Sequence, residues 1–260
     1  MKCKICGHPT KKALTHAIRT AHIADYLLCP NCDFMFVSNP TWLTEAYARP
    51  INITDTGYVM RNIYLSRKTL ILFSLLFKGQ GTFIDYAGGY GILTRIMRDY
   101  GLNFLWDDLY TENLFAQGFE YKKEKSVEIK ALTCFECFEH FIEPVAEIKK
   151  MLSISDTILF STLLKPLGIC PPENWQYYGF NHGQHTSFYS KKTFCYIAEK
   201  YGIYYYGAGE NLHILSKRKL NKRILSVVNI LTKLQADVFI KKILRTKTTS
   251  DQQSLIKKGF

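Results

Sequence analysis

The stretch "GTFIDYAGGYGILTRIMRDYG", residues 81–101, decides the fold class of this 260-residue chain. Its apolar start, Thr82 to Tyr86, is typical of a buried strand, and the residues after Gly91 have the pattern of a helix that ends before Gly101. A glycine-rich turn at this place lets the backbone approach a ligand closely at the helix N-terminus. The turn lacks the Lys-Ser/Thr of a P-loop and differs from the dinucleotide fingerprint G-x-G-x-x-G.

The segment "DYAGGYG", residues 85–91, resembles motif I of the class I S-adenosylmethionine (SAM)-dependent methyltransferases, commonly D-x-G-x-G-x-G. Asp85, Gly89 and Gly91 match that pattern, and Gly88 matches its D-x-G-G-G-x-G variant. Ala87 stands where the family usually has its first glycine. The resemblance implies that these five residues belong to the SAM-binding site.

An acidic pair follows about twenty residues later, where the apolar strand of "LNFLWDDLY" ends in Asp107 and Asp108. An acid at this place in a nucleoside-binding fold can accept hydrogen bonds from both ribose hydroxyls. We favour Asp108, because the pattern "DxYxENLFAxGFE" that begins there resembles methyltransferases of polysaccharide-modification loci. Asp107 is the alternative, and a solvated acid in a turn is the non-functional interpretation.

Strands and helices alternate through the rest of the chain. "IKALTCFE" and "DTILFSTLL" predict strands, "EPVAEIKKML" predicts a helix, and "YSKKTFCYIAEKYG" predicts a helix between Ser190 and Gly202. "IYYYGAGENLHILSKR" predicts a hairpin around a glycine turn. Over residues 80–217, the resemblance implies an α/β fold, the Rossmann-like class I methyltransferase sheet with a terminal β-hairpin. The short span between Phe119 and Ala131 leaves little room for a helix, and no adenine contact is assigned there.

The stretch "TCFECFEHFIEP", residues 133–144, places two glutamates and a histidine in a largely apolar run. Burying Glu136 and Glu139 is costly unless a partner offsets their desolvation. Many class I methyltransferases carry a similar E-x-x-E-H segment where the fourth strand ends beside the methyl donor. In the small-RNA 2′-O-methyltransferases, these residues and a later histidine bind a divalent metal. His140 and, in "GQHTSFYSKKTF", His185 occupy the matching places here.

Two interpretations of Glu136, Glu139, His140 and His185 stay open. In the first, they hold a catalytic divalent metal, which would lower the pKa of an acceptor hydroxyl. In the second, the glutamates accept hydrogen bonds from backbone amides and SAM, while His185 is a general base without any metal. His182 is a lesser candidate.

Two C-x2-C pairs stand at the start of the chain, with twenty-two residues between them. Each pair places two thiolates on a tight knuckle, so the two knuckles supply four tetrahedral ligands for a zinc ion. A site closed by four thiolates leaves no position for substrate, and we therefore predict a structural zinc. The predicted ligands are Cys3, Cys6, Cys29 and Cys32.

The predicted organisation has four parts. A zinc ribbon over 1–40 is followed by a helical linker over 41–80, the methyltransferase domain over 81–217 and a basic tail over 218–260. The tail has eleven Lys/Arg against two Asp, a net +9 of the chain's +12. Its residues 223–245 predict one amphipathic helix, and 246–260 a frayed end. Such a helix packs on its own domain or on a twin subunit, or lies on an anionic membrane surface.

Composition restricts the location and the partners. The apolar run "TLILFSLLF" is far shorter than the ~20 residues that span a bilayer, and the first residues lack a signal-peptide core. We therefore expect a cytoplasmic protein with reduced cysteines. Outside the tail the charge is small, which argues against nucleic-acid binding by the main domain.

The leading hypothesis is a SAM-dependent O-methyltransferase. Resemblance to capsule-type enzymes implies a sugar or a nucleotide-linked precursor of a cell-surface polysaccharide as the acceptor. The aromatic stretch 171–190 could cover that acceptor, or its aromatic residues could simply pack underneath a loop; these are Trp175, Tyr177, Tyr178 and Phe180. An RNA methyltransferase is the alternative, which the absence of Lys and Arg from 171–190 disfavours. A non-catalytic binding protein with a degenerate methyltransferase fold is the third reading.

Overall fold

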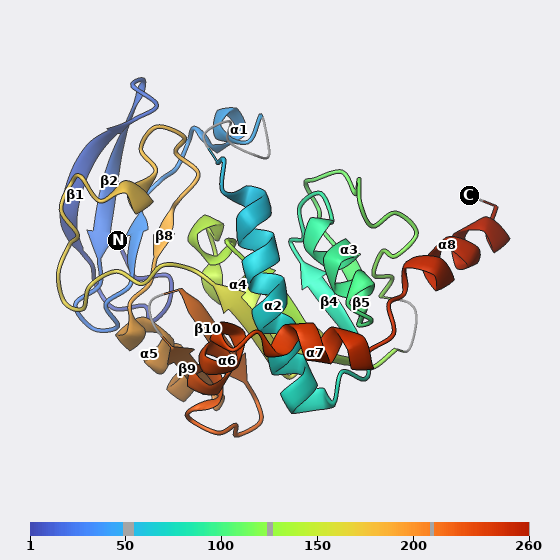
Figure 1. Cartoon of the computed structure of the whole chain (residues 1–260). Coiled ribbons are helices and arrows are strands. Elements are labelled where there is room, and N and C mark those ends of the chain that lie inside the picture. The colour runs from blue at the N-terminus through green and yellow to red at the C-terminus, as the bar shows by residue number, and fades with distance from the viewer. Residues whose placement is uncertain (49–54, 124–126, 209–210, 260) are drawn as a thin grey trace. The chain divides into compact units, whose positions relative to one another are not determined.

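The computed structural model describes all residues except 49–54, 124–126, 209–210 and 260, and Figure 1 shows its elements in chain order. The chain forms two compact units, and each contains several separate segments. The first comprises Met1–Asn52, Glu136–Ser153 and Phe160–Lys219, and the second Ile53–Phe135, Ile154–Leu159 and Leu220–Phe260.

The strands form two sheets, of order β1-β2-β3-β8 and β5-β4-β6-β7-β10-β9. The first consists of β1 (Lys11–Ile18), β2 (His22–Leu28), β3 (Met35–Val37) and β8 (Ser187–Phe188). The second consists of β4 (Thr82–Tyr86), β5 (Asn103–Asp107), β6 (Ile129–Phe135), β7 (Thr157–Ser161), β9 (Tyr204–Ala208) and β10 (Leu212–Ser216). The predicted α/β class with a Rossmann-like sheet and a terminal β-hairpin is confirmed.

Up to α5, the helices fall where the sequence predicted them. In chain order they are α1 (Leu43–Ala46), α2 (Tyr58–Phe77), α3 (Ile92–Asp99), α4 (Pro144–Ile154), α5 (Lys191–Tyr201), α6 (Ile224–Lys233), α7 (Ala236–Ile243) and α8 (Thr248–Lys257), with short 3₁₀ turns η1 (Phe138–His140) and η2 (Gln176–Tyr178). Helix α5 has the predicted caps, since the Ser190 side chain accepts from the Thr193 amide and Gly202 ends the helix in a left-handed conformation. None of the described helices is long and apolar enough to cross a membrane.

In the second unit, β4 pairs in parallel with both β5 and β6. Helix α2 packs against α3, α6 and α7, and its Phe73 ring contacts the rings of Phe83 and Phe104 from the neighbouring strands. Strands buried in this way are continuous apolar runs, as the sequence pattern indicated. The carboxyl ends of β4 and β5 carry the turn and the acids that resemble the SAM motifs.

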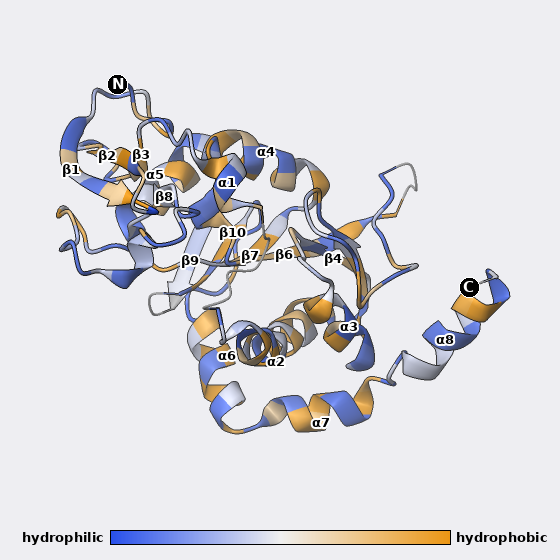
Figure 2. Cartoon of the chain, turned by 90° about the horizontal axis from the view of Figure 1, so that it is seen from above, coloured by the Kyte–Doolittle hydropathy of each residue, from blue (hydrophilic) through white to orange (hydrophobic). Residues whose placement is uncertain are grey.

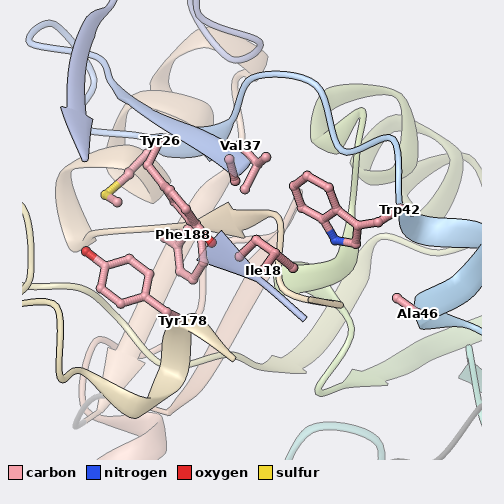
Figure 3. Close-up of a cluster of buried hydrophobic side chains, with 9 residues drawn as sticks. Ile18, Tyr26, Val37, Trp42, Ala46, Tyr178 and Phe188 are labelled. Atoms are coloured by element: carbon pink, nitrogen blue, oxygen red, sulfur yellow. The ribbon is translucent and has the colours of Figure 1, made fainter. Parts of the chain in front are cut away.

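In the first unit, the N-terminal sheet is completed by a strand from far along the chain. Phe36 of β3 pairs with Ser187 of β8, and Met35 pairs with Phe188. Tyr26, Tyr178 and Phe188 are fully buried in the core cluster on this sheet, shown in Figure 3. The 171–190 stretch is therefore built into the same unit as the N-terminal strands.

The tail differs from the sequence prediction. Instead of one helix over 223–245 there are two, because Gln235 takes a left-handed conformation with φ +56°. Residues 246–260 were predicted to fray, but 248–257 form helix α8, so this prediction is wrong. The cause is a long-range ion pair: Asp251 accepts from Nε and Nη2 of Arg98 at 2.7 and 2.6 Å. Helix propensities describe local sequence only, so they cannot predict a bidentate ion pair between residues this far apart.

The predicted linker over 41–80 consists of α1 and α2 in its described part. Residues 49–54 of this linker lie outside the described residues. The tip of the predicted hairpin turn, residues 209–210, is likewise outside them.

Candidate functional site

The glycine turn links the end of β4 to the start of α3 in the second unit. Gly91 has φ +87°, and a Cβ there would lie 2.8 Å from Oδ1 of Asn113, so a side chain does not fit. Ala87 has φ +54°, in the left-handed region that favours glycine. This explains why the family pattern has glycine at the position of Ala87. The turn keeps the glycine-type backbone although one glycine is replaced.

Asp85 lies beneath the turn and is 2% exposed. Its carboxylate accepts hydrogen bonds from Oγ1 of Thr94 at 3.2 Å and Oγ1 of Thr133 at 3.0 Å. Burial raises the pKa of Asp85 to about 7, although both threonine hydroxyls act in the opposite direction. Asp85 therefore ties β4, α3 and β6 together under the turn, and its side chain is engaged by the protein itself.

Asp108 also binds the turn directly. Its Oδ2 accepts from the Gly89 amide at 2.9 Å, and its Oδ1 accepts from the amides of Tyr110 and Thr111 at 2.8 and 2.9 Å. Three backbone donors thus already engage the carboxylate for which the sequence predicted a ribose role. Asp107 is the last residue of β5, and its carbonyl accepts from the Gly88 amide at 3.2 Å. The choice between Asp107 and Asp108 stays a prediction.

Other residues of this unit shape the turn and carry no motif of their own. The indole Nε1 of Trp106 donates to the Gly89 carbonyl at 2.8 Å. A Cβ on Gly89 would lie 2.7 Å from Oη of Tyr58, at the start of α2. The Tyr90 carbonyl accepts from the amides of Leu114 and Phe115. Nothing in the sequence distinguishes Trp106 or Tyr58 as a site residue, because an aromatic residue in a strand or helix is usually part of the hydrophobic core.

A second group of functional side chains lies in the first unit. One ligand atom from each of Glu139, His140 and His185 lies within 4.8 Å of the other two. Two segments are joined here, since the Thr186 amide donates to the Glu139 carbonyl at 2.8 Å and Oγ of Ser187 donates to the Phe141 carbonyl at 2.6 Å. These bonds place His185 beside η1. We call Glu139, His140 and His185 the Glu–His cluster.

Glu139 is 1% exposed, and its Oε2 has no hydrogen-bond partner among the described residues. Burial raises the pKa of Glu139 to about 8, the charge of Glu136 adds to this, and hydrogen bonds to Tyr177 and Thr162 partly offset it. A buried carboxylate oxygen without a donor is costly unless a ligand or ion completes it. This oxygen is the most direct sign of a missing positive partner in the cluster.

Both histidines of the cluster have one nitrogen fixed by a backbone carbonyl. Nδ1 of His185 lies 2.6 Å from the Tyr177 carbonyl, and Nδ1 of His140 lies 3.1 Å from the Gln184 carbonyl and 2.9 Å from Oη of Tyr47. Because a carbonyl only accepts, each Nδ1 carries the proton and each Nε2 is left as the basic nitrogen. Burial lowers the pKa of His140 to about 4 and that of His185 well below its ordinary value. Both rings are neutral, as metal ligands and general bases must be.

Glu136, the fourth predicted residue, lies outside this group of three. Its amide donates to Oγ of Ser161 at 2.8 Å, and that hydroxyl donates back to Oε1 of Glu136 at 2.6 Å. Glu136 has φ +50°, a conformation that costs energy for a residue with a side chain. The structure therefore brings three of the four predicted residues together and holds Glu136 through Ser161.

The remaining candidates of this region have packing roles. Nδ1 of His182 accepts from the Gln184 amide at 3.1 Å. His213 lies in strand β10, and its Nε2 is 3.0 Å from the Thr162 carbonyl. Tyr178 is fully buried in the core cluster (Figure 3), and Trp175, Tyr177 and Phe180 are partly buried against it. The packing interpretation of the 171–190 aromatic residues describes them better than stacking on an acceptor.

A family profile described as "Methyltransferase domain" matches residues 60–206, more than half of the chain. The chain belongs to this methyltransferase family. The prediction of a SAM-dependent methyltransferase is thereby confirmed at the level of family and fold. The matched range contains the glycine turn, both acids of the second strand and the Glu–His cluster.

The solved structures that are similar to this chain include three methyltransferases of low sequence identity. CalO1, a methyltransferase in calicheamicin biosynthesis in its SAH-bound form, is 12% identical with a TM-score of 0.42, over 59% of this chain and 54% of CalO1. Human N-acetylserotonin methyltransferase with SAM is 14% identical with a TM-score of 0.44, over 59% and 52%.

The third is the plantazolicin methyltransferase BpumL, in complex with a monoazolic desmethylPZN analog and SAH. It is 12% identical with a TM-score of 0.47, over 68% of this chain and 93% of BpumL. The alignments thus span about half the length of CalO1 and of the human enzyme. No curated protein sequence shows significant similarity to this chain.

Outside the range matched by the methyltransferase profile, the four N-terminal cysteines come together as predicted. Their sulfur atoms lie within 4.8 Å of one another, with Cys3 and Cys32 at 3.5 Å and Cys6 and Cys29 at 3.4 Å. Tetrahedral Zn–S bonds of about 2.3 Å place sulfur atoms roughly 3.8 Å apart, so the spacing fits a zinc ion. The hydrogen bond between Cys3 and Cys32 lowers the pKa of Cys3 to about 5 and raises the pKa of Cys32, so Cys3 is the more readily ionised of the two.

Proposed function

We propose that this methyltransferase uses SAM to methylate a hydroxyl group, and that a divalent metal held by the Glu–His cluster assists it. The observation that carries the metal is Oε2 of Glu139, buried without a donor among the described residues and accompanied by two neutral imidazoles. One carboxylate and two imidazoles suit Mn²⁺, Fe²⁺ or Zn²⁺ better than Ca²⁺.

The glycine turn of the second unit would hold the methyl donor. Gly88, Gly89 and Gly91 allow a close approach of the backbone to SAM, and an acid at the end of β5 would bind its ribose hydroxyls. Asp85 and Asp108 support this site in the structure, because each hydrogen-bonds the elements that form the turn. The sulfonium of SAM supplies the electrophilic methyl group.

The Glu–His cluster of the first unit would activate the acceptor. Glu139 supplies negative charge, and Nε2 of His140 and His185 supplies neutral ligands. A divalent ion bound there would lower the pKa of an acceptor hydroxyl. Without the ion, Nε2 of His185 is the basic atom that takes the hydroxyl proton, since its Nδ1 donates to the Tyr177 carbonyl. In both cases the backbone carbonyl fixes the tautomer of the ring.

We infer a sugar, or a nucleotide-linked precursor of a cell-surface polysaccharide, as the acceptor. The residue pattern from Asp108 to Glu120, which resembles polysaccharide-locus methyltransferases, supports this, and so does the lack of Lys and Arg in 171–190. A nucleic-acid acceptor would need phosphate-binding cations in such a stretch. A cytoplasmic location and a structural zinc at the four cysteines belong to the same proposal.

The decisive experiment is a methyl-transfer assay with radiolabelled SAM over a panel of nucleotide sugars, with and without a chelator. We expect transfer to at least one sugar, loss of it in chelator, and recovery with Mn²⁺ or Fe²⁺. Full activity in chelator would overturn the metal role and leave His185 as the base. SAM binding by calorimetry without transfer to any sugar, together with transfer to RNA, would overturn the acceptor class.

A further inference from the structure

The basic tail presents an apolar surface on two of its helices, α6 and α7, which pack against α2 within the second unit. Their inner residues are buried: Leu225 is 2% exposed, Val228 0% and Asp237 1%. In Figure 2, hydrophobic and hydrophilic residues alternate along both helices. The sequence pattern predicted this amphipathic character, and the structure shows which residues remain outside.

Six exposed residues of α6, α7 and the turn between them are large and apolar. They are exposed by 40 to 79%, with Ile230 at 57%, Leu234 at 68%, Phe239 at 66% and Ile243 at 79%. A series of apolar side chains this exposed over so few residues marks an interaction surface. We call this set the tail face; its members are Val227, Ile230, Leu234, Val238, Phe239 and Ile243.

The charge around the tail face is positive because its acids are engaged inside the unit. Asp237 accepts from Arg67 at 3.1 and 3.0 Å, and Asp251 accepts from Arg98 at 2.7 and 2.6 Å. These are the only two acids of residues 218–260. Both are thus neutralised by arginines outside the tail. Other cations are close to the apolar residues in the sequence, at Lys222, Arg223, Lys233, Lys242, Arg245 and Lys247.

We propose that the tail face lies on the surface of an anionic lipid bilayer. A basic amphipathic helix binds such a surface by inserting its apolar side chains while its cations meet anionic headgroups. A second copy of the same face would bring like charges together, because a two-fold interface sets a surface against itself. A nucleic acid would use the cations but would leave the apolar side chains in water. Only the anionic bilayer matches both features.

The test is co-sedimentation of the full-length protein with vesicles of phosphatidylcholine alone or with about 30% phosphatidylglycerol. The phosphatidylglycerol supplies the negative surface charge. We expect binding to the anionic vesicles only, weakened by salt. The double variant Phe239→Ser/Ile243→Ser should bind at least about tenfold more weakly, because insertion is lost. The matched control Ile23→Ser removes an equally exposed apolar residue, 72% exposed, from strand β2 and should bind like the wild type.

Circular dichroism and SAM calorimetry on each variant check that the fold is kept. Failure of the wild-type protein to bind anionic vesicles would overturn the proposal, and so would equal binding by the double variant. A dimer in analytical ultracentrifugation that Phe239→Ser/Ile243→Ser dissociates would show that the tail face binds another copy instead. Because SAM binding and methyl transfer in detergent-free buffer are measured separately, failure here leaves the proposed enzymatic function untouched.

Discussion

The acids of the two units are used in different ways. In the second unit, Asp85 and Asp108 accept hydrogen bonds through both carboxylate oxygens, from threonine hydroxyls in one case and backbone amides in the other. In the first unit, Oε2 of Glu139 has no partner among the described residues, although the side chain is equally buried. The difference indicates two roles. A carboxylate whose oxygens both accept hydrogen bonds from the protein stabilises the fold, whereas a buried carboxylate oxygen without a donor is available to a ligand or an ion.

The four-cysteine cluster is the most closed of the sites, because its four sulfur atoms face one another and leave no position for a substrate. We expect one zinc per chain, and Cys32→Ser to remove it and to lower the melting temperature of the first unit by more than about 10 °C, since structural zinc contributes folding free energy directly. SAM affinity should persist. Elemental analysis and thermal unfolding measure the two effects. Protein purified without chelator that contains no zinc would contradict this prediction.

At the open site, removal of the charge should affect turnover and spare donor binding. Glu139→Gln should lower kcat roughly 100- to 1000-fold, the scale for loss of one electrostatic contribution to a transition state, while the Kd for SAM stays within about twofold. Glu136→Gln is the matched comparison and should lower kcat less, because Ser161 already donates a hydrogen bond to that carboxylate. Steady-state kinetics and calorimetry separate the two quantities. Equal losses in both variants would show that the two glutamates act as one unit.

At the satisfied acids, the expected losses are smaller and concern the donor. Asp108→Ala removes a carboxylate that organises the Gly89 amide, and should weaken SAM binding by ~1.5–3 kcal/mol, the value of a hydrogen bond to a charged group. Asp107→Ala should have the larger effect if Asp107 is the residue that binds ribose. Calorimetric titration of both variants decides the assignment. If neither variant changes the Kd, the ribose lies elsewhere.

Per pH unit, the smallest expected effect is a slope in the free energy of unfolding with pH. The pKa of Asp85 is raised from 3.8 to about 7 by burial, so the folded state holds a proton that the unfolded state releases over this range. This contribution to the unfolding free energy is fully present below pH 3.8 and is lost as pH rises toward 7, by at most ~1.4 kcal/mol per pH unit. Asp85→Asn should lack the slope. Urea unfolding of both proteins at several pH values measures the difference, and parallel curves would refute it.

Local features of the fold were predictable from the sequence. The β4–turn–α3 unit, the caps of α5 and the cysteine knuckles each depend on residues close together in the chain. The described part of the hairpin also depends on residues close together in the chain. A glycine turn or a C-x2-C pair imposes its geometry whatever lies around it.

Long-range contacts set the limit of that prediction. Helix α8 exists where fraying was expected, because Asp251 binds Arg98, 153 residues earlier. Glu136 was expected to join the other three residues, but Ser161, 25 residues later, holds it. Proximity of His185 to His140 came from resemblance to a family, since no periodicity connects them. A single sequence carries no signal for such pairs, and only the folded backbone creates them.

The short strand β8 has a consequence for the order in which the protein can fold during synthesis. Strands β1 to β3 are complete by residue 37, but their sheet gains its last strand only at Ser187–Phe188. At ~5–20 residues per second, the ribosome needs roughly 8–30 s to reach it. During that time the zinc knuckles have their cysteines available, while the edge of β3 has no partner. Until then the edge of β3 is open to pairing with strands of other chains, so the late strand β8 also closes a site of possible aggregation.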